Sequence, residues 1–365
     1  MRIGILGTRG IPNAYGGFEQ FAQHLSVALV QKGHKIYVYN SSLHPYKEKQ
    51  WQGVNIIHCK DWENKLGATG QFVYDWNCIN DARKRNFDIL LQLGYTSNST
   101  WHWRWPKNSI NIVNMDGLEW KRTQYSMVTR KFIKWAEAWA VKYGDHLIAD
   151  SPAIQEYLLK QYNRKSTYIP YGAEIFTHAE NKFLDRFDLS ANQYYLIAAR
   201  MEPENNIEMI LNGYLNSRQD YPLILVGNII NRFGKQWSKK YAAANIEFVG
   251  AIYDIPVLNN LRYFSKLYFH GHSAGGTNPS LLEAMACSCR IAAHENVFNR
   301  AVLQNEADYF FDSKDVTEIL NRNIDENLIH RRKEIHLEKI KLFYNWDKVN
   351  NDYEKLMIEL LSTRQ

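Results

Sequence analysis

The sequence lacks the features that define several classes of protein. Its 365 residues include only 4 cysteines and no C-x-x-C pair, which argues against a disulfide framework and against a zinc or redox site of that spacing. No stretch approaches the ~18 consecutive apolar residues of a membrane span, and no apolar signal-peptide region follows Met1. We therefore expect buried, reduced thiols and a cytoplasmic protein, with contact at the inner face of the cell membrane as the alternative location.

Patterned metal ligands are also missing. The sequence has no D-x-D pair of carboxylates and no H-x-x-x-H pair, which disfavours metal-dependent catalysis, and we expect no cofactor. Hydrophobic residues make up 45% and charged residues 22%, a balance typical of a folded globular protein. The net charge of +6 favours an anionic substrate or an anionic membrane surface over nucleic acid, since no nucleic-acid-binding motif occurs.

Short apolar runs alternate with helix-length segments along the whole chain, which predicts parallel sheets covered by helices. The length exceeds the usual ~100–200 residues of one domain, so we expect two doubly wound α/β units. The expected linker between them starts with Pro170, Tyr171 and Gly172 and continues to Asn192. The expected strands are residues 3–7, 35–39, 88–93, 110–115, 146–149 and 167–170 in the first unit, and 194–199, 222–226, 246–249, 266–269 and 290–293 in the second.

Two segments are rich in aromatic residues. Residues 127–147 predict an amphipathic helix whose aromatic and apolar stripe is Val128, Phe132, Trp135, Trp139 and Tyr143. This helix either packs its stripe on the sheet or lies as a basic interfacial helix on anionic lipid. Residues 101–106 contain three tryptophans, which either contact a sugar or pack at a domain edge.

A glycine-rich loop follows the first expected strand. Gly16 and Gly17 open the next helix, where glycines let a phosphate-bearing ligand approach the backbone at the helix N-terminus. A dinucleotide site is disfavoured, because the glycines lack the G-x-G-x-x-G spacing and the second strand ends at Asn40 instead of an acidic residue.

Residues 270–286 are the most informative segment. Pro279 is placed for the first turn of a helix, so the backbone amides of Gly276, Thr277 and Asn278 are expected to face an anion. Glu283, one turn further along, offers two acceptor oxygens to a diol such as a ribose. The alternative is an ordinary loop-to-helix junction in which Glu283 only caps or meets solvent.

Arg200 is the second candidate for binding an anion. It stands at the carboxyl end of the expected strand 194–199, where ligands bind in open α/β sheets, and its guanidinium matches phosphate oxygens. A surface ion pair with Glu202 or Glu204 is the alternative.

Together these segments resemble the family-four glycosyltransferases, retaining enzymes of the GT-B fold that use nucleotide sugars. The resemblance extends over nearly the whole chain and lies in residues 16–19, 148–151, 169–173, 199–205, 247–250, 279–286 and 344–347. Residues 10–19, 115–122, 169–174 and 272–284 are most similar to a subgroup of bacterial rhamnosyltransferase-like enzymes.

The resemblance implies two Rossmann-like domains that face a central cleft. Residues 1–172, with a crossover helix at 346–365, would bind the acceptor, and residues 173–345 would bind the donor. The implied donor-binding residues are Gly16, Gly17, Arg200, Asn205, Gly250, Gly275, Gly276, Thr277, Asn278 and Glu283. Arg200 would stabilise the leaving diphosphate, and Asp116 and Glu119 would orient the acceptor. Alternatively, Asp116 only caps the turn at Gly117.

Three positions depart from the family pattern. Gly275 replaces a glutamate that contacts the donor sugar, which leaves the identity of that sugar open. Asn205 replaces the phosphate-binding lysine, so Arg200, the helix N-terminus and the Gly16 and Gly17 amides would have to compensate. Met115 replaces a histidine near the C6 hydroxyl of the sugar, which is compatible with a 6-deoxy donor and also with inactivity.

The function implied is a metal-independent hexosyltransferase. It would move rhamnose or a related hexose, with retention, from a dTDP- or UDP-sugar to a glycan or lipid-linked acceptor in the synthesis of capsule, O-antigen or exopolysaccharide. The main alternative is a non-catalytic homologue that binds a nucleotide sugar or a glycan. A nucleotide-sugar 2-epimerase of the same fold is a further alternative.

Overall fold

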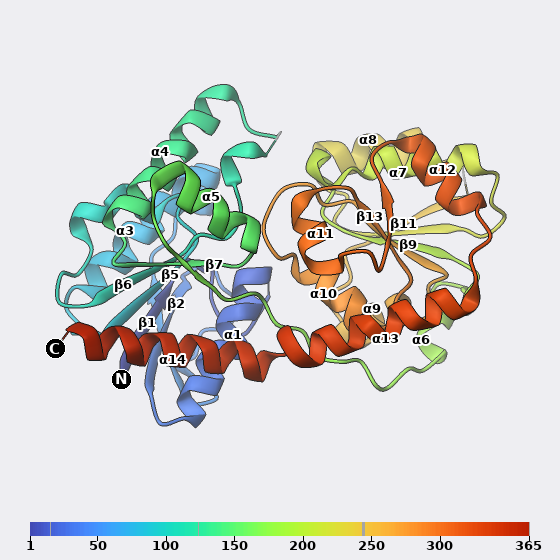
Figure 1. The fold of residues 1–365 in the computed structure, drawn as a ribbon. Helices are drawn as coiled ribbons and strands as arrows, with labels where there is room; N and C mark the ends of the chain where they lie inside the picture. The colour runs from blue at the N-terminus through green and yellow to red at the C-terminus, as the bar shows by residue number, and fades with distance from the viewer. Residues whose placement is uncertain (15, 123, 243–244, 365) are drawn as a thin grey trace. The chain divides into compact units, whose positions relative to one another are not determined.

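The structure is a computed structural model that describes residues 1–364 except 15, 123, 243 and 244. Tyr15, in the glycine-rich segment, therefore lies outside the described residues. The chain divides into two compact units (Figure 1). Unit 1 comprises Met1–Trp120, Tyr125–Tyr171 and Trp346–Gln365, and unit 2 comprises Lys121–Gln124 and Gly172–Asn345.

Unit 1 contains an eight-stranded sheet of order β3-β4-β2-β1-β5-β6-β7-β8. Neighbouring strands are parallel except for the antiparallel pair β3 and β4 at one edge. The elements of unit 1 are β1 (Arg2–Leu6), α1 (Gly17–Gln31), β2 (Lys35–Ser41), β3 (Gln50–Trp51), β4 (Val54–Cys59), α2 (Glu63–Leu66), η1 (Gly67–Thr69), α3 (Gly70–Ala82), β5 (Ile89–Leu93), η2 (Asn98–Arg104), β6 (Ile110–Asn114), η3 (Glu119–Lys121, whose last residue falls in unit 2), α4 (Met127–Tyr143), β7 (His146–Ala149), α5 (Pro152–Tyr162), β8 (Thr167–Tyr168) and α14 (Trp346–Arg364).

Helices cover both faces of the sheet of unit 1. Figure 1 shows α1 and α14 on one face and α3, α4 and α5 on the other. The central strands are buried on both faces, as the adjacent residues Ile5 and Leu6 of β1 show with 0% exposure, and this is why the strands consist of unbroken apolar runs.

The last helix, α14, packs on α1 in unit 1. The ring of Trp346 stacks on His24 at 4.2 Å, and the ring of Tyr353 lies 4.9 Å from that of Phe21. The Asn114 side chain donates to the Tyr353 hydroxyl at 3.0 Å, which ties α14 to the end of β6. The end of the chain is therefore part of the first unit although it follows the second in sequence.

Unit 2 contains a six-stranded parallel sheet of order β11-β10-β9-β12-β13-β14. Its elements are α6 (Lys182–Asp185), β9 (Tyr195–Ala198), η4 (Pro203–Asn205), α7 (Ile207–Ser217), β10 (Leu223–Val226), α8 (Arg232–Lys240), β11 (Ile246–Gly250), α9 (Ile255–Tyr263), β12 (Leu267–His270), α10 (Pro279–Ala286), β13 (Ile291–His294), α11 (Val297–Leu303), β14 (Asp308–Phe310), α12 (Ser313–Asn321) and α13 (Glu326–Phe343).

The sheet of unit 2 is also covered on both faces. Figure 1 shows α7, α8 and α12 on one face and α9, α10 and α13 on the other. A core cluster that includes Ile197 of β9, Leu211 of α7 and Val316 of α12 fills the first of these layers. Two parallel, doubly wound α/β sheets confirm the expected fold class.

None of the helices formed by the described residues is both long and apolar enough to cross a membrane.

Candidate functional site

The strand order of each sheet reverses at one point, and ligands of open α/β sheets bind there, outside the carboxyl ends of the strands. In unit 2 the reversal lies between β9 and β12, and in unit 1 it lies between β1 and β5. Most of the residues predicted from the sequence lie in loops at these two points.

Two loops that flank the reversal in unit 2 are fastened to each other through their backbones. A Cβ on Gly271, just after β12, would stand 2.0 Å from the carbonyl oxygen of Asn205. The Asn206 side chain donates to the Gly271 carbonyl at 2.8 Å. Ser273 donates to the Glu204 carbonyl from its amide at 3.0 Å and from its hydroxyl at 2.8 Å. These contacts fix the loop that follows β9 against the loop that follows β12.

Arg200 lies in the first of these loops with its side chain 67% exposed. Its Nη1 is 3.5 Å from Glu202 Oε1, so the ion pair expected as an alternative is present. A pair this exposed contributes little, and a phosphate would compete with it readily. Asn205 is 3% exposed and donates to the Arg200 carbonyl at 2.7 Å, so its amide supports the backbone that carries the guanidinium.

Two glutamates and a further arginine lie beside Arg200. Glu204 is 4% exposed, and its Oε1 is 3.3 Å from Nη1 of Arg122. Glu202 Oε2 is 3.9 Å from the same nitrogen. Burial raises the pKa of Glu202, and the positive charges of Arg200 and Arg122 oppose that rise. This cluster was not predictable from the sequence, because Arg122 is 80 and 82 positions away from the two glutamates.

Two histidines at the end of β12 stack on each other. The rings of His270 and His272 lie 4.4 Å apart. His270 is fully buried, neither ring nitrogen has a hydrogen-bond partner among the described residues, and burial together with His272 holds its pKa well below the usual value. Burial, Arg200 and Arg122 lower the pKa of His272 to about 3. Both imidazoles are therefore neutral near pH 7, and Arg200 carries the exposed positive charge at this point.

The loop before α10 leads into a helix whose first turn contacts the end of β9, the strand that precedes Arg200. Asn278 is the N-cap of α10, its side chain accepts from the Ser280 amide at 3.0 Å, and Pro279 opens the helix. The Ser280 hydroxyl donates to the carbonyl of Ala198 at 3.3 Å, which places the first turn of α10 at the end of β9. Thr277, just before the cap, is buried.

Three predicted glycines lie in unit 2, one at the end of β11 and two in the loop before α10. Gly275 has φ +122° and Gly250, at the end of β11, has φ +80°, and open space surrounds the Cβ position of each. Gly276 follows Gly275 in the loop before α10. The space beside these backbones is compatible with a ligand that approaches them closely.

Glu283 lies on α10 and is held in an ion pair with Arg262 of α9. The distance from Arg262 Nη2 to Glu283 Oε2 is 2.6 Å, and the side chains are 3% and 23% exposed. Arg262 was not predicted from the sequence, because a single arginine near the end of a short helix has no distinctive pattern.

In unit 1 the loop after β1 is held by polar side chains. Glu19, in the first turn of α1, is 4% exposed and accepts from the Thr8 hydroxyl at 3.1 Å and from the Arg9 amide at 2.8 Å. Gly16 is the N-cap of α1 and Gly17 is its first residue. The glycines and Glu19 thus form one rigid turn in which the carboxylate holds the loop.

Asn40 has a structural role in the same loop. Its side chain accepts from the Ile11 amide at 3.0 Å and donates to the Ile11 carbonyl at 2.7 Å. Asn40 stands where a dinucleotide site would have an acid for the ribose. Here its side chain binds the backbone of the β1–α1 loop instead.

Asp116 and Glu119 lie just beyond β6 in unit 1. Asp116 has φ +32° and its carboxylate accepts from the Tyr171 hydroxyl at 3.4 Å. The amide of Glu119 donates to the Tyr95 hydroxyl at 3.1 Å. Met115, in front of them, is 2% exposed. Both acids follow the carboxyl end of β6 in the chain, and their role in orienting an acceptor stays a prediction.

Asp75 is a buried carboxyl on α3 of unit 1. It is 1% exposed, accepts from the Ser97 hydroxyl, and its Oδ1 has no hydrogen-bond partner within the described ranges. Burial raises its pKa from 3.8 to about 7, and the bond from Ser97 opposes that rise.

This shift predicts the pH dependence of stability. The unfolded chain loses the Asp75 proton near pH 4 whereas the folded chain keeps it to about pH 7, so Asp75 lowers stability progressively over this interval. Asp75→Asn removes the titration, and we expect it to stabilise the protein by up to about 4 kcal/mol at pH 8 and by far less at pH 4. Denaturant unfolding of both proteins at the two pH values measures this, and an equal difference at both would contradict it.

The aromatic stripe of α4 does not pack on the sheet. The buried side of α4 consists of Ile133, Ala136, Glu137, Ala140 and Val141. In the stripe, Val128 is 79% exposed, Trp135 63% and Tyr143 42%. The interpretation that packs the stripe on the sheet is therefore wrong for these three residues. Small residues allow α4 to approach the sheet closely, and the larger side chains remain outside.

The tryptophans of residues 101–106 form part of a cluster with α3. The ring of Trp76 lies 4.6 Å from that of Trp101 and 5.7 Å from that of Trp103, and Trp105 is buried. Trp103 is 57% exposed, and the Arg104 guanidinium lies over its ring at 5.7 Å. The segment thus packs at the edge of the unit and leaves one indole exposed.

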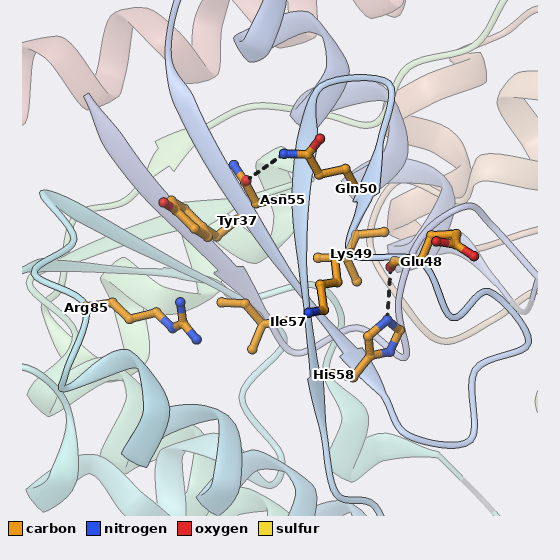
Figure 2. A pocket seen from close by; sticks show the side chains of 9 residues that line it. Tyr37, Glu48, Lys49, Gln50, Asn55, Ile57, His58 and Arg85 are labelled. Atoms are coloured by element: carbon orange, nitrogen blue, oxygen red, sulfur yellow. Dashed lines mark hydrogen bonds between the residues drawn. The ribbon is translucent and has the colours of Figure 1, made fainter.

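Unit 1 has a surface hollow along β2 and β4. It has a volume of about 930 Å³ and is lined by side chains of β2 and β4 and the segment before β4, among them Tyr37, Lys49, Asn55 and His58 (Figure 2). None of the site residues predicted from the sequence lines this hollow. Across the part of the chain that the structure describes, no group of three or more His, Cys, Asp or Glu side chains is arranged to hold a metal ion.

Comparisons with known proteins agree with this architecture. Residues 1–174 match a family described as Domain of unknown function (DUF1972). No curated protein matches the chain significantly. Sucrose-phosphate synthase from Thermosynechococcus elongatus is 15% identical, with 99% of each chain covered and a TM-score of 0.79. HepE from Anabaena, solved with UDP and glucose, is 14% identical, with 98% of this chain and 100% of that chain covered and a TM-score of 0.77.

A glycosyltransferase from Rickettsia africae is 14% identical, with 99% of this chain and 98% of that chain covered and a TM-score of 0.72. At these identities the likeness shows the fold and not the activity. The two parallel sheets and these full-length structural matches show that the chain has the GT-B fold.

Proposed function

We propose that the protein is a glycosyltransferase that binds a nucleotide-sugar donor at the strand reversal of unit 2. The observation that carries this proposal is the exposed guanidinium of Arg200 beside the Asn278-capped start of α10, with Glu283 on the same helix. A fixed positive charge and helix N-terminal amides suit a diphosphate, and a carboxylate suits a ribose hydroxyl. HepE, which shares the fold, was solved with UDP and with UDP-glucose.

The proposed reaction is transfer with retention, in which the acceptor hydroxyl attacks from the face that the diphosphate leaves. The bond from the sugar to the diphosphate breaks as the new glycosidic bond forms, and the departing diphosphate accepts the proton of the hydroxyl. Arg200 and the amides of Thr277 and Asn278 stabilise the charge that grows on the leaving phosphate, without a metal ion. Asp116 and Glu119 orient the acceptor hydroxyl. The open backbone at Gly250 admits the base of the nucleotide.

The proposed donor is a dTDP- or UDP-sugar that carries rhamnose or a related hexose, as in the rhamnosyltransferase-like enzymes of family four. Met115, buried and apolar, is compatible with a 6-deoxy sugar, and Gly275 offers no side chain to contact the sugar. The proposed acceptor is a glycan or a lipid-linked saccharide of a surface polysaccharide.

Calorimetric titration of the full chain with dTDP, UDP, GDP, ADP and NAD tests the donor site. We expect dTDP or UDP to bind selectively and Glu283→Ala to weaken that binding. If no nucleoside diphosphate binds, the transferase proposal fails. Binding without consumption of any donor would favour the non-catalytic homologue instead.

We further propose that α4 contacts an anionic membrane, where a lipid-linked acceptor would be found. Val128 and Trp135 are exposed on its outer side, together with Lys131 and Lys142. Exposed apolar side chains interleaved with lysines suit the boundary between acyl chains and anionic headgroups.

Sedimentation with phosphatidylglycerol vesicles tests this contact. We expect the protein to bind and Trp135→Ala to weaken binding about tenfold, because the indole would lose its buried apolar area. Tyr253→Ala, which removes a 71% exposed aromatic residue from unit 2, is the matched control and should bind like the unaltered protein. Equal losses in both variants, or binding that is indifferent to salt, would contradict the proposal.

A further inference from the structure

Arg262 is a deeply buried cation that the proposed reaction does not use directly. It lies on α9 with its side chain 3% exposed, and its Nη2 is 2.6 Å from Glu283 Oε2 on α10. Its Nη1 donates to the Asn259 side chain at 3.1 Å. Removing a guanidinium from water is costly unless its partner is well placed, so this pair fixes the position of both side chains.

A second buried ion-pair cluster in unit 2 shows what a purely structural arrangement looks like. Asp308 contacts Arg290 at 3.0 Å, Arg322 at 2.6 Å and Arg332 at 3.1 Å, and its side chain is 2% exposed. That carboxylate is enclosed by its partners. The side chain of Glu283, in contrast, is 23% exposed although its partner is almost fully buried. The ion pair thus joins the buried guanidinium of Arg262 to a carboxylate that solvent reaches.

The position of Glu283 relative to Arg200 is also fixed. Ser280, three residues before Glu283, donates to the Ala198 carbonyl, two residues before Arg200. Arg262 holds α10 from α9, and Ser280 holds it from β9. The carboxylate of Glu283 is therefore held from both sides at a constant place beside the anion-binding loop.

We propose that Arg262 is a positioning residue that orients Glu283 toward the 3′-hydroxyl of the nucleotide ribose. This inference rests on the proposed function. A carboxylate has about four acceptor positions, so it can accept from Arg262 and from a hydroxyl together. The ion pair restricts the Glu283 rotamers before the ligand arrives, which reduces the entropy lost on binding. The 3′-hydroxyl is common to thymidine and uridine nucleotides, so the proposal holds for either donor.

The test compares the nucleoside diphosphate that binds best with its 3′-deoxy counterpart. We expect the unaltered protein to prefer the 3′-hydroxyl form about 10- to 100-fold, as for a hydrogen bond to a charged group. Arg262→Gln should reduce this ratio to about 2 while the 3′-deoxy form binds nearly as before. Arg262→Lys keeps the charge but loses the planar fork, so it should restore part of the ratio.

Two further variants separate positioning from a loss of stability. Arg290→Gln weakens a buried ion pair at the amino end of β13, and it should lower stability without changing the ratio. Glu283→Gln should reduce the ratio by itself, and adding Arg262→Gln should then have little further effect.

The possible failures are distinguishable. If no nucleoside diphosphate binds, the proposed function fails and this inference fails with it. If a nucleotide binds but the unaltered protein shows no preference for the 3′-hydroxyl, or if both Arg262 variants keep the full preference, the donor site stands and the positioning role is wrong.

Discussion

Replacing Arg200 by alanine is expected to lower the affinity for the preferred nucleoside diphosphate by about 10- to 100-fold. The estimate corresponds to one or two charge-assisted hydrogen bonds of about 1.5–3 kcal/mol in total. The Arg200 side chain is 67% exposed and its ion pair with Glu202 spans 3.5 Å. An ion pair this exposed adds little to the free energy of unfolding. Binding should therefore fall while the melting temperature stays nearly constant, which calorimetry and thermal unfolding measure on the same samples.

A matched control exists in the same unit. Arg331 on α13 is 61% exposed and lies 3.3 Å from Glu306, so Arg331→Ala removes the same charge from a similar surface pair. We expect it to bind nucleotides like the unaltered protein. Equal losses in the two variants would mean that Arg200 acts only through the net charge, and no loss in either would remove Arg200 from the site.

Gly271→Ala is expected to have the largest effect on folding. The new Cβ would stand 2.0 Å from the Asn205 carbonyl oxygen, and that backbone is already fixed by the bonds from Ser273 and Asn206. The loops after β9 and β12 would have to separate. We expect a loss of about 3 kcal/mol in the free energy of unfolding, at the upper end for overpacking, together with weaker nucleotide binding.

Gly250→Ala is the control for this variant. Gly250 has φ +80° but open space around its Cβ position, so alanine there meets backbone strain without a collision. We expect a loss of about 1 kcal/mol. Denaturant unfolding compares the two. If Gly271→Ala proved no more destabilising than Gly250→Ala, the two loops would not be in the close contact described.

The sequence predicts the central strands well because they are buried on both faces. β7 (His146–Ala149) has the expected bounds, and the other expected strands differ by one or two residues at their ends. Three strands were missed. β4 (Val54–Cys59) is interrupted by Asn55 and His58, and β3 and β14 contain only two and three residues. Strands that are very short, or half-exposed as β4 is, lack the apolar run that marks a fully buried strand.

The residues of the candidate site likewise divide into those that the sequence predicts and those that it does not. Arg200 and the start of α10 are predictable, because a residue just after a strand and a proline in a first helical turn have known meanings. Arg262 and Arg122 are not, since each finds its glutamate only through the tertiary fold. The α4 stripe shows the limit of periodicity, which identifies an amphipathic helix but not the side that packs inward when small residues such as Ala136 and Ala140 line that side.

The most direct test of the central claim is sugar transfer itself. Radiolabelled dTDP-rhamnose and UDP-hexoses would be incubated with the full chain and a panel of lipid-linked saccharides, and product and released nucleoside diphosphate would both be measured. We expect incorporation of one sugar with equimolar release of the diphosphate, reduced strongly in Arg200→Ala and unchanged in Arg331→Ala. A protein that binds the nucleotide yet consumes no donor, or that transfers equally well without the Arg200 guanidinium, would contradict it.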